Sequence, residues 1–129
     1  MRWISLGALF GGLSVLLGAF GAHSLKAIVT AQKLGAFQTG TQYLGYHALA
    51  LILLGIVSVQ WGAPDNQPLK KSGYFFVAGI LMFSGSLYGL TFDGPRFLGP
   101  ITPLGGLSLM IGWFTFAWTV FKKSKSQSI

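Results

Sequence analysis

The sequence predicts an all-α membrane protein, a bundle of four transmembrane helices with a short interfacial amphipathic helix between the first two spans. Its 129 residues are 52% hydrophobic and only 9% charged, whereas soluble domains are usually about 25% charged. The charges fall in short gaps between long uncharged stretches, and these stretches do not alternate apolar and polar residues as barrel strands would. Since only helices and closed barrels satisfy every backbone polar group in lipid, the spans are predicted to be helices.

The expected spans form one domain over residues 1–129, and each needs roughly 20 apolar residues to cross a bilayer. The second uncharged stretch is too long for one span, so its helix is predicted to begin at the capping-box pattern Thr39-Gly40-Thr41-Gln42. The fourth helix is predicted to begin with Thr102 as N-cap and Pro103 at the first helical position. The resulting spans cover about residues 3–22, 41–61, 72–92 and 102–121.

The first span and the segment that follows it each match a further sequence pattern. Arg2, an apolar run and the small residues Ala19 and Gly21 also describe a cleavable signal peptide. The apolar run is longer than the usual signal-peptide core of roughly 7–15 residues, so we expect a retained span. After this span, within residues 23–38, Leu25 and Ile28 fall on one helical face and Lys26 on another, which predicts the interfacial helix.

The distribution of Lys and Arg predicts the orientation in the membrane. With four spans, one side of the membrane carries six of these residues: Arg2, Lys70, Lys71, Lys122, Lys123 and Lys125. The other side carries three: Lys26, Lys33 and Arg96. By the positive-inside rule, both termini should face the cytoplasm from the inner (plasma) membrane, or the matrix from the mitochondrial inner membrane in a eukaryote. We assign the net charge of +7 to anchoring at membrane lipids, and expect no nucleic-acid partner.

Small residues recur every three or four positions in two of the predicted spans. They are Gly7, Gly11, Ser14, Gly18 and Gly21 in the first span, and Gly105, Ser108, Gly112, Thr115 and Thr119 in the fourth. Helix association in lipid depends on close backbone approach, which small residues permit. We therefore predict helix-packing seams at these stripes, above all at Gly7, Gly11, Gly18, Gly105 and Gly112.

The spans contain no Asp, Glu, Lys or Arg at depth, although chemistry within a membrane usually requires ionisable residues. The remaining candidates for a ligand-binding site are expected at the non-cytoplasmic end: His23, Tyr43, His47, Tyr88, Asp93 and Arg96. We expect Asp93 and Arg96 to form an ion pair, and His23, His47 and Arg96 to share one polar cluster. That cluster would either fix the helix register or bind a head group.

Cofactor chemistry and catalysis have little support in the sequence. His23 and His47 could ligate a haem, or a metal with Asp93 as third ligand, but two histidines without cysteines are a minimal ligand set. Hydrolase and nucleotide-binding motifs do not occur in the sequence. We therefore expect no catalytic residue, no metal, no cofactor and no enzymatic activity.

Five segments match motifs of one family of small membrane proteins. They read GAFGAHSL at residues 18–25, FQTGTQY at 37–43, YHALAL at 46–51, FSGSLY at 83–88 and GPITPLGG at 99–106. The chain thus resembles the domain of unknown function 423 family, the YwdK/YgdD-like proteins, of which mitochondrial transmembrane protein 256 is a relative. The resemblance implies a multi-pass protein of a bacterial or mitochondrial inner membrane, and it implies no activity.

These observations favour a non-enzymatic protein that acts through helix packing, as an accessory or assembly subunit or as a homo-oligomer. Its partners would be another membrane protein or a second copy. One alternative is a binder or carrier of a lipid, quinone or other small hydrophobic molecule at the non-cytoplasmic end. A more remote alternative is a bis-histidine haem protein.

Overall fold

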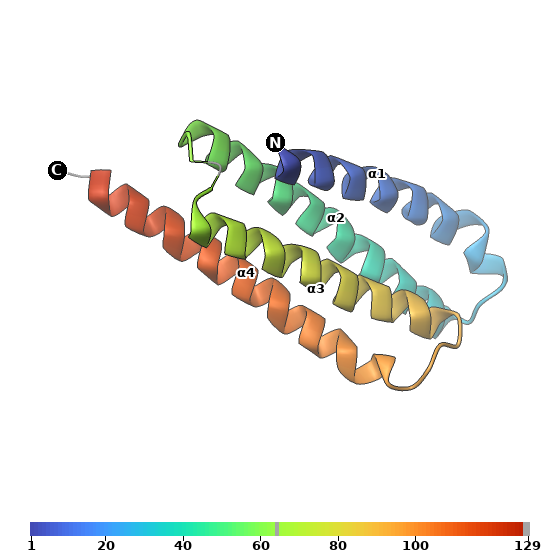
Figure 1. Cartoon of the computed structure of the whole chain (residues 1–129). Helices are drawn as coiled ribbons and strands as arrows, with labels where there is room; N and C mark the ends of the chain where they lie inside the picture. The colour runs from blue at the N-terminus through green and yellow to red at the C-terminus, as the bar shows by residue number, and fades with distance from the viewer. Residues whose placement is uncertain (64, 128–129) are drawn as a thin grey trace.

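Four long helices make up most of the structure (Figure 1). The computed structural model describes residues 1–63 and 65–127, with side chains as far as residue 125. α1 covers Arg2–His23, α2 covers Ala31–Gln60, α3 covers Gln67–Thr91 and α4 covers Leu98–Gln127. The described residues contain no strand, and all four helices are long and apolar enough to cross a membrane. The prediction of an all-α bundle with four transmembrane helices is confirmed.

Each helix packs antiparallel beside the next in the chain, so that α2 and α3 lie at the centre and α1 and α4 flank them (Figure 1). The core is formed by Leu51 and Leu54 of α2, Phe76 and Ile80 of α3, and Leu109 of α4. The two outer helices keep apolar side chains on their exposed surfaces. This distribution suits a bundle whose solvent is lipid, because apolar side chains then need no cover from the protein.

The small residues of α1 line its contact with α2. A Cβ atom on Gly7 would lie 2.7 Å from the carbonyl oxygen of Ala48, and one on Gly21 would lie 3.1 Å from the Phe37 ring. Contact is looser at Gly11 and Gly18, where a Cβ would meet α2 side-chain atoms at 4.0 and 3.9 Å. The α1 stripe therefore lies in a helix seam, which is tightest at Gly7.

The contact between α3 and α4 is closer still. A Cβ on Gly105 would overlap the backbone nitrogen of Phe83, and one on Gly112 would lie 2.7 Å from the Phe76 ring. On the facing helix, a Cβ on Gly79 would lie 3.0 Å from the carbonyl oxygen of Gly105. Backbone thus meets backbone at Gly79 and Gly105, although the spacing of small residues in the sequence had not singled out Gly79.

α2 begins ten residues before its predicted start. Thr30 is the N-cap, and its hydroxyl oxygen accepts a hydrogen bond from the backbone N–H of Lys33 at 3.2 Å. The capping-box pattern at residues 39–42 lies inside the helix, where a Cβ on Gly40 would meet the Tyr88 ring at 3.1 Å. Gly40 therefore permits the approach of α3 rather than marking a helix start.

The connection between α1 and α2 is also shorter than predicted. It contains a three-residue 3-10 helix, η1 (Leu25–Ala27), and the chain becomes α-helical again at Ala31. The later part of the predicted interfacial helix is thus the first turns of α2. Leu25 is fully buried, so η1 is fixed by packing against the bundle.

α4 begins at Leu98, four residues before its predicted start, and it contains Pro103 in its interior. Thr102 is not the N-cap: its hydroxyl donates to the carbonyl oxygen of Leu98 at 3.3 Å and meets the Ser86 hydroxyl of α3. A proline inside a helix removes one backbone hydrogen bond. Here the loss falls near the helix start, where packing against α3 holds the chain.

We predict that Gly105→Ala lowers the stability of the bundle, whereas Gly106→Ala does not. The first substitution forces a Cβ onto the Phe83 backbone, and overpacking of this kind costs about 1–3 kcal/mol. The neighbouring substitution places a Cβ 3.8 Å from the Phe83 ring, which is ordinary contact. Thermal unfolding in mild detergent, followed by circular dichroism, measures both. Equal melting temperatures for the two variants would contradict the α3–α4 seam.

Candidate functional site

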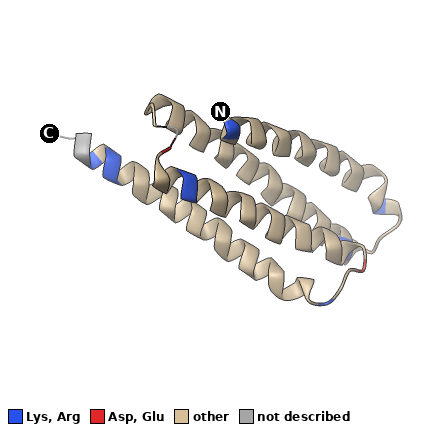
Figure 2. Cartoon of the chain, in the orientation of Figure 1, with Lys and Arg blue, Asp and Glu red and all other residues tan. Residues whose placement is uncertain are grey.

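Charged residues lie at the two ends of the bundle, and the middle of the helices carries none (Figure 2). One end holds the N-terminus, the α2–α3 connection and the last turns of α4, and we call it the basic end. The opposite end holds η1 and the α3–α4 connection, and we call it the η1 end. The candidate residues from the sequence were expected to cluster at the η1 end.

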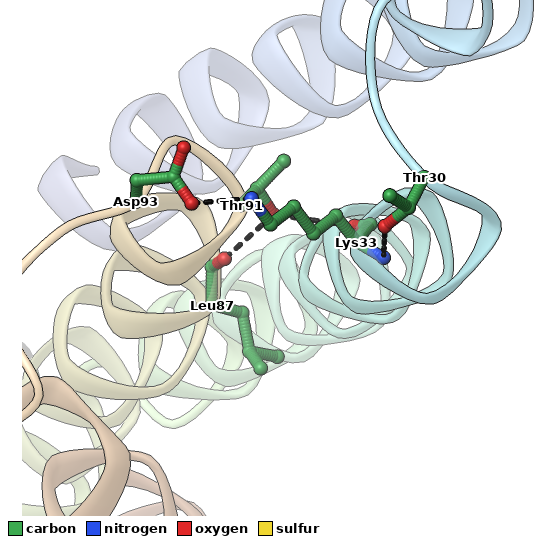
Figure 3. A network of polar contacts seen from close by, with 5 residues as sticks. All are labelled: Thr30, Lys33, Leu87, Thr91 and Asp93. Carbon is green, nitrogen blue, oxygen red and sulfur yellow. Dashed lines mark hydrogen bonds and ion pairs between the residues drawn. The ribbon is translucent and has the colours of Figure 1, made fainter.

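A polar network at the η1 end joins the start of α2 to the end of α3 (Figure 3). The Lys33 ammonium forms an ion pair with the Asp93 carboxylate. The Thr91 hydroxyl donates to the carbonyl oxygen of Leu87 at 2.8 Å, and the carbonyl oxygen of Lys33 lies 3.4 Å away. Thr30 caps the same turn of α2. The network ties two helices together where their polar ends emerge.

Asp93 occupies an unusual backbone position, with a φ of 61°. The N–H of Gly94 donates to the carbonyl of Gly89 at 2.7 Å and that of Asp93 to Leu90 at 3.3 Å, which is a Schellman motif. Asp tolerates this left-handed conformation better than most residues. The same motif ends α2, where Gly62 holds the left-handed position.

The predicted ion pair between Asp93 and Arg96 is wrong, because the Asp93 carboxylate pairs with Lys33 instead. The left-handed turn directs the Asp93 side chain toward the first turn of α2 (Figure 3). Arg96 is exposed and forms no ion pair with another residue of the described chain.

His47 is buried within the bundle, where its ring joins α2 to α4. The indole N–H of Trp113 donates to His47 Nε2 at 2.9 Å, and His47 Nδ1 lies 2.7 Å from the carbonyl oxygen of Tyr43. An indole nitrogen can only donate, so Nε2 carries no proton and Nδ1 donates to Tyr43. His47 is thus a neutral imidazole with both nitrogens engaged, and neither is available to a haem iron or a metal.

This position is deeper than the sequence predicted. Because α2 begins at Ala31, His47 lies about 24 Å along the helix from its start, at 1.5 Å per residue. Its partner Trp113 lies about 22 Å along α4 from Leu98 by the same measure. The structure therefore does not bring His47 together with Arg96, which precedes Leu98 at the η1 end.

The other residues that were candidates for a ligand-binding site lie at different depths in the bundle. The Tyr88 hydroxyl hydrogen-bonds the Thr41 hydroxyl at 2.9 Å, and the Tyr43 ring stacks on His47 with centroids 6.0 Å apart. His23 ends α1 as an exposed residue, and it forms no hydrogen bond with another residue in the described part of the chain. Tyr43, His47, Tyr88 and Asp93 contact neighbouring helices at several depths. His23 and Arg96 are exposed, and the six candidates do not converge on one ligand.

The η1 end also has a small hollow. It lies between α1 and α2, lined by Leu17, Gly21, Phe37 and Thr41 among others, and its volume is about 200 Å³. Ligand pockets usually measure roughly 300–1,000 Å³. The described residues contain no group of three His, Cys, Asp or Glu side chains that could hold a metal ion.

Sequence reasoning missed Trp113, which completes the contact at His47. The Trp113 ring also meets the Phe76 ring edge-on, with centroids 5.1 Å apart, so three helices join at one aromatic cluster. A signal was present, since a buried imidazole in an apolar helix needs hydrogen-bond partners and a tryptophan on a facing helix can donate one hydrogen bond. The pairing itself depends on helix register, which no local pattern specifies.

We predict that Trp113→Phe destabilises the bundle by about 1 kcal/mol, because it leaves His47 Nε2 without its donor. Trp118→Phe is the matched control, since Trp118 is 61% exposed. Denaturant unfolding in detergent measures both stabilities, and ¹⁵N NMR of the imidazole reports the Nδ1-protonated form. A protonated Nε2 in the wild-type chain would overturn the assignment.

A second prediction concerns the Schellman turn after α3. Asp93→Ala should destabilise the protein more than Asp93→Gly, by roughly 1 kcal/mol, because alanine at positive φ is strained and glycine is not. Lys33→Ala should cost less than about 1 kcal/mol, as is typical of exposed ion pairs. Equal stability of the two Asp93 variants in unfolding experiments would show that backbone conformation does not limit this position.

Comparison with known proteins agrees with this architecture. The family described as "Protein of unknown function (DUF423)" matches residues 17–106. A UPF0382 membrane protein of Haemophilus influenzae is 38% identical over 97% of both chains. UPF0382 membrane protein YwdK of Bacillus subtilis is 40% identical over 86% of this chain and 89% of its own. No solved structure matches the chain significantly. The chain belongs to the DUF423 family, whose bacterial relatives are called UPF0382 membrane proteins, as the sequence motifs predicted.

Proposed function

We propose that the protein is a non-enzymatic protein of the bacterial inner membrane. It would act through helix contacts, as a subunit beside another membrane protein or as an oligomer with a second copy of itself. The observation that carries this proposal is the use of the buried polar groups. His47 bonds Tyr43 and Trp113, and the Ser84 hydroxyl donates to the Gly40 carbonyl at 2.7 Å. These groups hold the helices together, which supports a role in packing over a role in chemistry.

The outer face of α1 offers a surface for such a contact. α1 presents a second set of small residues away from α2, all of them exposed: Ser5, Ala8, Gly12 and Ala19. A Cβ on Gly12 would meet no heavy atom within 4 Å, so this set is not part of the bundle's own seams. Small residues at such spacing let a neighbouring helix approach closely. We therefore place the partner contact on this face.

The charges support an orientation with both termini in the cytoplasm. The basic end carries six of the nine Lys and Arg residues, and it includes the N-terminus and the last turns of α4 (Figure 2). Short connections with more Lys and Arg remain on the cytoplasmic side.

A photo-cross-linking amino acid at residue 12, introduced into the full chain in native membranes, tests the proposed contact. We expect one discrete cross-linked product, either a dimer of this chain or a complex with a larger protein. The matched control is residue 85 on α3, another exposed glycine at which a Cβ would meet no heavy atom within 4 Å. Recovery of monomer alone from residue 12, or equal products from both sites, would contradict a contact role for the α1 face.

A further inference from the structure

A hollow of about 500 Å³ opens at the basic end, between the α2–α3 connection and the last turns of α4. Its cationic lining residues are Lys71 on α3 and Lys122 and Lys123 on α4. Trp61 and Trp118 supply aromatic walls, and Thr115 and Thr119 lie between the helices. The combination is a basic rim over an amphipathic floor, at the level where tryptophan favours the membrane–water interface.

Two of the rim lysines, Lys71 and Lys122, form no ion pair with an acidic side chain among the described residues. Asp65 and Asp93 are its two acidic side chains, and each is paired with another lysine. Asp93 pairs with Lys33 at the η1 end, and Asp65 lies 3.6 Å from the ammonium of Lys70. Neither carboxylate forms an ion pair with Lys71 or Lys122. Within the described residues, Lys71 and Lys122 therefore have no carboxylate partner and can bind an anion from outside the chain.

We propose that this hollow binds the phosphodiester head group of an anionic phospholipid, a site distinct from the helix contact proposed above. Lys71 and Lys122 approach from different helices, so a phosphate between them would join the start of α3 to the end of α4. The Lys123 ammonium lies over the Trp61 ring, 5.3 Å from its centroid, which is a cation–π contact at the aromatic wall. Basic pockets between membrane helices on the cytoplasmic side bind anionic head groups in this way.

A lipid explains the hollow better than a free anion does. The site faces the bilayer along α4, whose neighbouring side chains Phe114, Trp118 and Phe121 are 71%, 61% and 56% exposed. Acyl chains attached to a bound head group would continue along this apolar surface. Inorganic phosphate has no apolar group that could contact that surface or the Trp118 ring.

Native mass spectrometry of the full chain in mild detergent tests the site, with dioleoyl phosphatidylglycerol and dioleoyl phosphatidylcholine as matched probes. We expect Lys71→Gln/Lys122→Gln to weaken phosphatidylglycerol binding roughly 25-fold, since each lysine near an anionic surface contributes about fivefold. Binding of phosphatidylcholine should be weak and unchanged. Both lysines are exposed, so the double variant should fold normally, which circular dichroism verifies.

The control variant is Lys26→Gln/Arg96→Gln, which removes the same charge from the η1 end. It should change phosphatidylglycerol binding less than twofold. Equal losses for the two double variants would show general electrostatic attraction and would overturn the site. Displacement of phosphatidylglycerol by millimolar inorganic phosphate would also overturn it, because the pocket would then bind a free anion rather than a lipid.

Discussion

The structure depends on the requirement that polar groups carried into lipid find partners within the protein. His47 meets this requirement with two partners on different helices, the Tyr43 carbonyl of α2 and the Trp113 indole of α4. The Thr41–Tyr88 and Ser84–Gly40 contacts join α2 to α3 in the same manner. Each contact fixes the rotation and register of a helix, because a slipped helix would leave a polar group unsatisfied in hydrocarbon. His47, one of the two histidines that suggested a cofactor site, thereby helps to hold the bundle together.

α1 is held against the other helices mainly by close packing. Within the described residues, no side-chain hydrogen bond joins α1 to α2, and the Arg2–Tyr74 contact of 3.5 Å links α1 to α3 at the basic end. Association then depends on close packing, which Gly7 allows against Ala48 and Gly55 allows against Ile4. A helix held in this way exchanges neighbours more readily than one tied by buried hydrogen bonds. Its outer small-residue face is consistent with a helix that lies between the bundle and a partner.

Composition and charge spacing predicted the helices themselves, because a hydrocarbon layer of fixed thickness sets the length of every span. The glycine stripe of α1 was visible for the same reason, since helical periodicity is local. The starts of α2 and α4 were not predictable from capping patterns: Gly40 and Thr102 serve contacts with α3. The partners of His47 and Asp93 also depend on tertiary register, so Trp113 and Lys33 could not be assigned from spacing alone.

Disulfide cross-linking in membranes tests most directly that α1 is packed by its glycine stripe in this register. The chain contains no cysteine, so each engineered pair reports without background. A Cβ at residue 11 lies 4.0 Å from that of Ala48, within the range of a disulfide, whereas one at residue 12 has no neighbour within 4 Å. Gly11→Cys/Ala48→Cys should therefore oxidise rapidly, and Gly12→Cys/Ala48→Cys should not. Equal cross-linking of the two pairs, or faster cross-linking of the second, would contradict the packing of α1 on α2.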